Sequence, residues 1–185
     1  MLNSLAKSIR FDNASKGFDP LEGGLNRYLL LTISEICEAQ EELRDGRGVA
    51  EIYYEAIKIG HKVVDPNVPD EGLPIFSKKP CGFPVEIADA AIRIMDIMAK
   101  LEYNVEILEY RPDKDPSIDI DSELIAIIST IPVCFREHVD KKAQLTMALS
   151  ALFILAGYCG FNMMNVIQEK LAFNRTRPPK HGRKF

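Results

Sequence analysis

The sequence predicts an all-α protein, and three features of the chain support this fold class. Apolar residues recur mostly at steps of three and four, which is the spacing of one face of a helix. No clear run of alternating apolar and polar residues indicates a β-sheet. Proline and glycine separate the periodic segments, as they do where helices begin and end. We expect an antiparallel helical bundle that forms a single domain over residues 1–185.

The first strong helix is predicted over residues 25–44, where apolar side chains follow one another at helical spacing. It ends at Asp45-Gly46, because glycine tolerates the left-handed conformation of a helix end. A short helix is predicted over residues 49–60. The prolines and glycines between residues 65 and 82 then predict a long ordered loop.

The second half of the chain predicts four more helices, each with a boundary signal. Pro84 suits a first helical turn, where its missing N–H costs nothing. Pro132 bends or ends an apolar helix, and Asn162 can cap the last one. The predicted helices lie at residues 84–103, about 121–132, about 140–158 and from 162 to the prolines at 178 and 179.

Composition and charge describe a soluble globular protein with an acidic surface. Hydrophobic residues make up 46% of the chain and charged residues 27%. The net charge of -4 argues against binding to nucleic acid or to an anionic membrane, since both need a basic excess. A phosphate-bearing ligand must therefore be held locally, by a metal or by a few placed cations.

The cysteines and the N-terminus indicate a cytoplasmic protein. The four cysteines form no CxxC pair and lie mostly in apolar runs, as buried reduced thiols do. The N-terminal segment lacks the apolar stretch of a signal peptide. Residues 143–168 carry no charge and are long enough to span a bilayer, but polar residues and glycines interrupt them. We expect a helix buried on nearly all sides, not a membrane span.

Pairs of acidic residues at a spacing of three mark two of the predicted helices. Glu35 and Glu38 project from the same face of the first long helix, and Glu42 extends that stripe. Glu86 and Asp89 repeat the spacing in the helix that follows Pro84. Two such pairs on antiparallel helices could bring four carboxylates into one small volume.

Four carboxylates in one volume repel one another unless a cation lies between them. Mg²⁺ is suited to this role, because it takes oxygen ligands and shares its coordination with substrate phosphates. The alternative is that these acids only solvate exposed helix faces.

A cationic face marks the last helix. Lys170, Asn174 and Arg177 follow at steps of four and three, so they share one side of the helix. Two cations beside an amide can grip phosphate oxygens, and arginine can do so through two parallel bonds. The alternative is that the positive charges favour the C-terminal end of the helix dipole.

The chain resembles the MazG-like nucleotide pyrophosphohydrolases of the all-α NTP pyrophosphatase superfamily. Three segments carry the resemblance, in order: LLLTISEICEAQEELRDGRG, KKPCGFPVEIADAAIRIMDIM and EKLAFNRTRPPKHGRKF. The resemblance implies a bundle of the MazG-like type that assembles into homodimers or homotetramers. It also implies that Glu35, Glu38, Glu86 and Asp89 hold Mg²⁺, with Mn²⁺ as a plausible substitute, and that Lys170, Asn174 and Arg177 contact the phosphates.

The expected reaction converts a (d)NTP and water into the monophosphate and pyrophosphate, with a metal-activated water attacking the α-phosphorus. Glu38 is the first candidate for the catalytic base, and Glu42 or Glu41 is the second. Arg93 lies on the same face as Glu86, where it either orients a carboxylate or binds substrate. For Asp96, which continues that stripe, a supporting role and a plain solvated position are both open.

Resemblance to the larger members of the family favours purine (d)NTPs such as dGTP. The segment around Phe11, Asn13 and Phe18 could fold over the nucleotide, and His181 could touch a phosphate. The competing hypothesis is a non-catalytic helical protein that binds nucleotide or metal, or serves as an interaction module.

Overall fold

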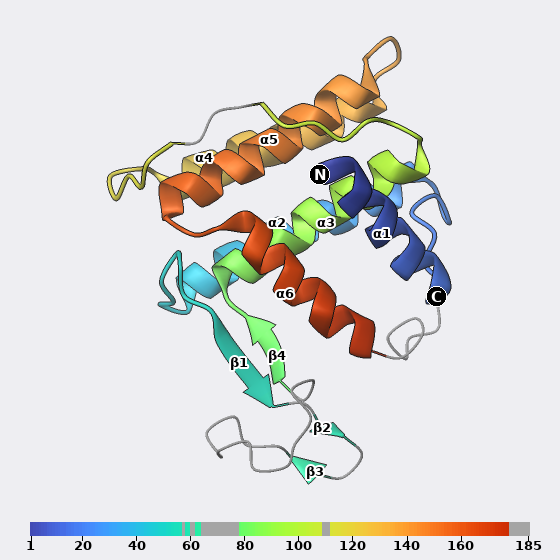
Figure 1. Ribbon diagram of the computed structural model, residues 1–185. Helices are drawn as coiled ribbons and strands as arrows, with labels where there is room; N and C mark the ends of the chain where they lie inside the picture. The colour runs from blue at the N-terminus through green and yellow to red at the C-terminus, as the bar shows by residue number, and fades with distance from the viewer. Residues whose placement is uncertain (57, 60–61, 64–77, 109–111, 178–185) are drawn as a thin grey trace.

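The computed structural model describes the whole chain except residues 57, 60–61, 64–77, 109–111 and 178–185 (Figure 1). The described chain is mostly helical, which confirms the all-α class at that level. Its helices are α1 (Leu2–Ser15), α2 (Leu25–Arg44), α3 (Phe83–Lys100), α4 (Ile120–Thr130), the 3-10 helix η2 (Ile131–Phe135), α5 (Lys141–Cys159) and α6 (Met163–Thr176).

Helix α3 is the centre of the fold. It packs against α1, α2, α5 and α6, and its apolar residues are almost all buried. Ile87, Ile94 and Met98 are fully buried along its length. Because α3 is surrounded by other helices, polar side chains that it carries inward are removed from water as well. Helix α2 lies beside it, while α4 and α5 pair at one end of the molecule (Figure 1).

Most helix boundaries follow the sequence signals. Pro84 lies in the first turn of α3. Asp140 Oδ1 accepts a hydrogen bond from the Ala143 amide at 3.1 Å, and Asn162 Oδ1 accepts one from the Asn165 amide at 3.1 Å, so both residues cap helices. Helix α4 tightens into η2 one residue before Pro132. Helix α1 was not predicted, although Leu2, Leu5, Ala6 and Ile9 follow one another at helical spacing.

The predicted helix over residues 49–60 is wrong. Strand β1 (Tyr53–Ala56) pairs antiparallel with β4 (Lys78–Cys81), and Tyr53 lies opposite Cys81. Strands β2 (Lys58–Ile59) and β3 (Lys62–Val63) form a second short pair. The β1–β4 pairing joins residues that are far apart in sequence, so no local spacing reveals it. Most of the predicted long loop lies outside the described residues.

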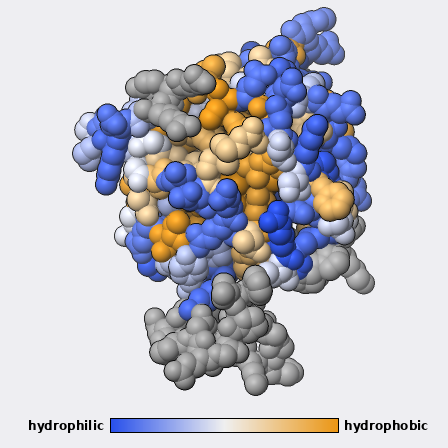
Figure 2. All heavy atoms as spheres, in the orientation of Figure 1, coloured by the Kyte–Doolittle hydropathy of each residue, from blue (hydrophilic) through white to orange (hydrophobic). Residues whose placement is uncertain are grey.

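Helix α5 (Lys141–Cys159) is largely apolar but only partly covered. Within the described chain it is the one helix long and apolar enough, by length and composition, to cross a membrane, and 44% of that stretch is buried. The expectation of burial on nearly all sides is therefore wrong for the single chain. In Figure 2, apolar side chains gather in the middle of the visible face, and hydrophilic ones frame them.

Candidate metal centre and cavity

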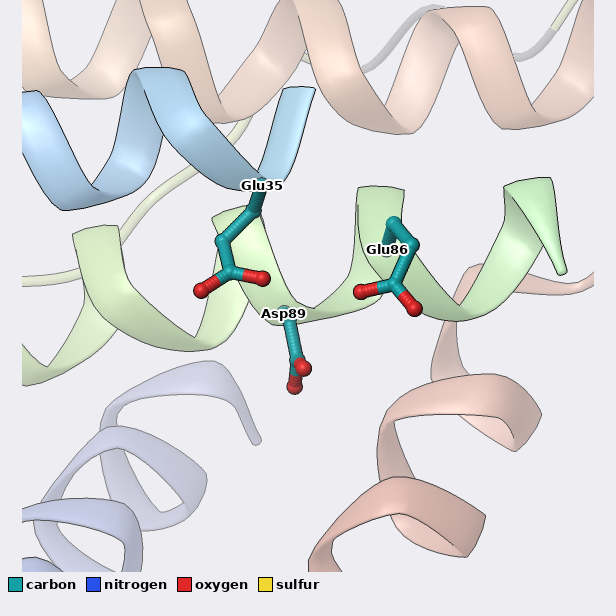
Figure 3. A group of neighbouring side chains, drawn as sticks. All are labelled: Glu35, Glu86 and Asp89. Carbon is teal, nitrogen blue, oxygen red and sulfur yellow. The ribbon is translucent and has the colours of Figure 1, made fainter. Parts of the chain in front are cut away.

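Three carboxylates meet where α2 crosses α3. Glu35 projects from α2, and Glu86 and Asp89 project from successive turns of α3 towards the same space (Figure 3). One ligand oxygen from each lies within 4.8 Å of the others. Glu35 and Glu86 are buried, with 7% and 6% of their surface exposed. The two acidic pairs are therefore brought together by the packing of two helices, with three of their four members in contact range.

The carboxylates line one end of a cavity of about 440 Å³. Side chains from β4 and α6 complete that end. The other end is lined by the connection between α1 and α2 and by the start of α2, including Asn13, Phe18, Arg27 and Tyr28. The cavity lining thus combines acidic, basic and aromatic side chains, with the three convergent carboxylates at one end. Phe11, which was expected near this region, is 74% exposed and does not line the cavity.

Two cations, the half-buried Arg93 and the buried Lys170, already pair with members of the acidic group. Arg93 Nε donates to Glu35 Oε1 at 2.7 Å, and Arg93 Nη2 contacts the same oxygen. Lys170 Nζ lies 2.7 Å from Asp89 Oδ2, with only 4% of the residue exposed. Of the two roles considered for Arg93, the structure shows the contact with a carboxylate. Lys170, expected to meet phosphate, is likewise placed against a carboxylate.

Glu86 has no such compensation. Among the residues that the structure describes, no hydrogen bond or ion pair reaches its carboxylate. Burial, opposed by the charge of Lys170 but reinforced by Asp89 and Glu35, raises the pKa of Glu86 to about 7. Burial also raises the pKa of Glu35, although the Arg93 guanidinium opposes the shift. A divalent cation would relieve both effects.

The other predicted acids lie apart from the three carboxylates. Glu38 lines the cavity but is exposed, and its Oε1 accepts a 3.3 Å hydrogen bond from the Ser34 hydroxyl. Glu42 does not line the cavity; its Oε1 accepts a hydrogen bond from the Tyr53 hydroxyl at 3.1 Å. Glu41 pairs loosely with Arg44 on the surface. Of these three acids, only Glu38 lines the cavity.

The end of α6 supplies the remaining predicted phosphate ligands. Asn174 and Arg177 both line the cavity. Asn174 Oδ1 is buried without a hydrogen-bond partner, and the Arg177 guanidinium lies 5.8 Å from the centre of the Phe173 ring. The Lys16 ammonium donates to the main-chain oxygens of Asn174 and Arg177, which holds this end of α6 against α1. His181 lies outside the described residues.

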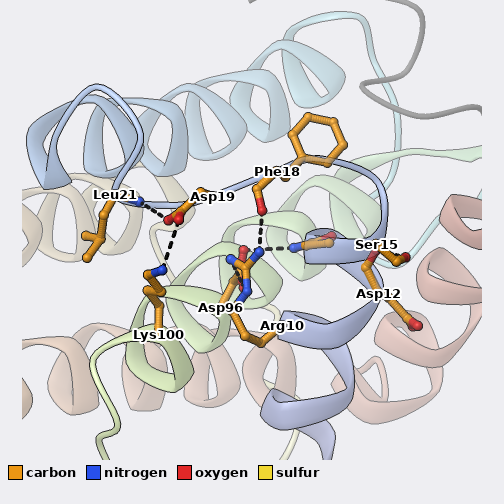
Figure 4. Close-up of polar contacts among 9 residues, drawn as sticks. Arg10, Asp12, Ser15, Phe18, Asp19, Leu21, Asp96 and Lys100 are labelled. Atoms are coloured by element: carbon orange, nitrogen blue, oxygen red, sulfur yellow. Dashed lines mark hydrogen bonds and ion pairs between the residues drawn. The ribbon is translucent and has the colours of Figure 1, made fainter.

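A buried polar cluster ties α1 to α3 beside the cavity. Asp96 is fully buried, and its two oxygens accept hydrogen bonds from Arg10 Nη1 at 2.9 Å and from Asn13 Nδ2 at 2.8 Å (Figure 4). Arg10 also donates to the Phe18 main-chain oxygen, and Lys100 Nζ reaches Asp19 Oδ2 at 2.9 Å. Asp96 thus supports the cavity wall. Of the two alternatives that the sequence left open, a supporting role and a solvated position, the structure shows the first.

No protein-family model, no curated protein and no solved structure matches the chain. The function therefore has to be inferred from the geometry and chemistry of the cavity.

Proposed function

We propose that this protein is a Mg²⁺-dependent nucleoside triphosphate pyrophosphohydrolase of the MazG-like type. The supporting observation is the group formed by Glu35, Glu86 and Asp89, whose oxygens converge within 4.8 Å at one end of a cavity. The cavity is large enough for a small ligand such as a nucleotide. Buried acids that receive no full compensation from the protein are typical of sites that bind a cation.

The residues present fit Mg²⁺. The group offers oxygen ligands only, which is the set that this ion prefers. Glu86 lacks any partner among the described residues, so a cation would satisfy a carboxylate that the protein leaves bare. Glu35, Glu86 and Asp89 would hold the ion, and Glu38 lies on the same cavity wall. A bound Mg²⁺ would lower the pKa of a coordinated water and offset phosphate charge.

The side chains of the cavity have different roles in the proposed reaction. Glu38 accepts a proton from the attacking water, and the water oxygen forms a bond to the α-phosphorus. The bond between the α-phosphorus and the oxygen that bridges it to the β-phosphorus breaks, which releases pyrophosphate. Arg93 and Lys170 hold Glu35 and Asp89 in place. Asn174 and Arg177 face the phosphates from the end of α6, where charge accumulates on the leaving group.

Product analysis tests this function. The purified protein is incubated with each of the common ribo- and deoxyribonucleoside triphosphates and Mg²⁺, and the products are separated by ion-exchange chromatography. We expect the monophosphate and pyrophosphate, with a preference for purine nucleotides such as dGTP. The diphosphate and orthophosphate would contradict the proposed bond cleavage. Nucleotide binding without any product would favour the alternative, a non-catalytic binding protein.

Glu38→Ala tests the proposed base. Loss of general-base catalysis is expected to lower kcat by about 100-fold or more. Glu41→Ala is the matched control, because Glu41 lies one turn further along α2, is exposed and does not line the cavity. Equal rates for the two variants would remove Glu38 from the mechanism without affecting the metal site.

The proposal also includes the metal preference, the location and the assembly of the protein. We expect Mn²⁺ to substitute for Mg²⁺, the protein to be cytoplasmic, and the chain to form a homodimer or homotetramer without nucleic-acid or membrane partners. Sedimentation equilibrium of the purified chain tests the assembly, and a monomer at micromolar concentration would contradict it.

A further inference from the structure

Lys79 is a cavity cation that neither helix pattern points to. It lies on β4, and its side chain lines the same end of the cavity as Glu86 and Asp89. Burial lowers the pKa of Lys79, but its interactions with Cys81, Glu55 and Glu86 outweigh this effect, so the pKa lies above its ordinary value. The ammonium group is therefore charged at the acidic end of the cavity.

The backbone holds Lys79 in a defined position relative to the acidic group. Its partner across the β1–β4 ladder is Glu55. Strand β4 then passes directly into α3 through Gly82, whose φ is +115°. A Cβ on Gly82 would lie 2.3 Å from the Glu51 main-chain oxygen, so the junction is packed against the segment that enters β1. Lys79 and Glu86 are thus carried by one continuous, closely packed piece of backbone.

The charges of the cavity show why another cation is needed. A triphosphate must enter a space whose lining includes seven carboxylates, those of Asp19, Glu22, Glu35, Glu38, Glu86, Asp89 and Asp96. The two most deeply placed cations, Arg93 and Lys170, already form ion pairs with carboxylates. Either cation would leave its carboxylate unpaired if it turned to a phosphate, and the partner of Arg93, Glu35, is buried.

Lys79, in contrast, is held only by an exposed ion pair among the residues that the structure describes. Its ion pair with Glu55 spans 3.5 Å, and 43% and 54% of the two side chains are exposed. An exposed pair of this kind contributes little to stability, so a phosphate oxygen can displace it. The flexible lysine stem lets the ammonium move while the strand stays in place.

We propose that Lys79 binds the polyphosphate of the substrate at the acidic end of the cavity. This role rests on the proposed function, since it assumes a polyphosphate ligand brought in with Mg²⁺. It assigns to a strand residue the contact that the helical pattern had assigned to Lys170.

Calorimetric titration with inorganic tripolyphosphate and Mg²⁺ tests the proposal without requiring turnover. Removing one charge-assisted contact in Lys79→Ala is expected to weaken binding about tenfold. Lys79→Arg, which keeps the charge, should retain most of the affinity. Lys78→Ala is the matched control, because neighbouring strand residues point to opposite faces and Lys78 does not line the cavity.

A second pair of variants covers the possibility that Lys79→Ala fails to fold. Glu55→Gln removes the competing carboxylate and should tighten tripolyphosphate binding, whereas Glu51→Gln removes an exposed acid that pairs with Arg47 and should leave it unchanged. Equal affinities for wild type, Lys79→Ala and Glu55→Gln would overturn the role of Lys79 and leave the pyrophosphohydrolase proposal standing. A wild-type protein that neither binds tripolyphosphate nor releases pyrophosphate would end both.

Discussion

At the scale of single residues, Glu86 has the least favourable environment in the cavity. It is buried and surrounded by other acids, while Glu35 and Asp89 each have a cation within hydrogen-bond distance. The folded chain therefore holds a proton on Glu86 more tightly than an unfolded chain does. This difference links the protonation of one carboxyl to the stability of the metal-free protein.

The predicted consequence is a pH-dependent loss of stability that Glu86→Gln removes. Because the pKa of Glu86 rises from 4.5 to about 7 on folding, the folded state binds more protons between these values. The free energy of unfolding should then decrease as pH rises through this window and level off above it. Urea unfolding in EDTA at about pH 5 and about pH 8 measures the difference.

Glu137→Gln provides the control for that measurement, because Glu137 is exposed. It should keep the wild-type pH dependence. If Glu86→Gln keeps it as well, the raised pKa does not belong to Glu86 in the folded protein.

At the scale of elements, α1 is attached to the bundle by contacts of very different burial. The Arg10–Asp96 pair is 17% and 1% exposed at its two side chains, whereas the Arg175–Asp12 pair between α6 and α1 is 53% and 24% exposed. Arg10→Ala would leave Asp96 buried with only Asn13 as a partner. We expect it to lower the free energy of unfolding by about 3 kcal/mol, the scale for breaking a buried pair.

Arg175→Ala is the matched comparison, because it removes the same type of side chain from a more exposed pair. Arg175 lies on α6, and its partner Asp12 lies on α1. Its effect should be about 0–1 kcal/mol. Chemical denaturation of both variants gives the values. Similar losses for the two would show that the Asp96 cluster does not anchor α1.

The junction between β4 and α3 is the second element-scale feature that admits a direct test. Gly82→Ala would place a methyl group 2.3 Å from the Glu51 main-chain oxygen at a φ of +115°, so the strand or the helix start must shift. A destabilisation of about 2 kcal/mol or more is expected. Gly48→Ala, whose added methyl group would lie 3.7 Å from the nearest side-chain atom, should change stability much less. Thermal unfolding compares the two.

At the scale of the whole molecule, metal binding should stabilise the fold because its ligands come from two helices. Mg²⁺ at about 100 times its Kd is expected to add about 2.7 kcal/mol. For a chain of this length that corresponds to a rise in Tm of roughly 5–10 °C. Differential scanning calorimetry with Mg²⁺, and again after EDTA, measures it; Glu86→Gln should abolish the rise. A Tm that is unaffected by Mg²⁺ in the wild type would contradict the metal centre.

Sequence patterns predicted most of the helical framework. Apolar spacing located the longer helices, and the cap at Asn162 located the start of α6, because these signals act within a few residues of one another. The strand at Tyr53 was predicted as helix, because its partner Cys81 lies in a distant segment. Propensity is a weak guide where a distant pairing decides the conformation.

The candidate site was predictable to a similar degree. Spacing along α2 and α3 placed Glu35, Glu86 and Asp89 on the correct faces, and the structure brings them together. Spacing also put Glu42 on the stripe with Glu38, but Glu42 turns to the Tyr53 hydroxyl. No local pattern identified Lys79, because it lies on a strand that the helical spacing did not predict.

The chain's own sequence determined which faces of its helices are apolar and which carry acids, since both follow from the helical repeat. Only the tertiary structure decided which charges neutralise one another and which stay uncompensated. Arg93 pairs with Glu35 and Lys170 with Asp89, while Glu86 has no ion pair among the described residues, because of how α2 and α6 pack against α3. Electrostatic interactions depend on distance and burial in three dimensions, and neither is encoded in the spacing of a single helix.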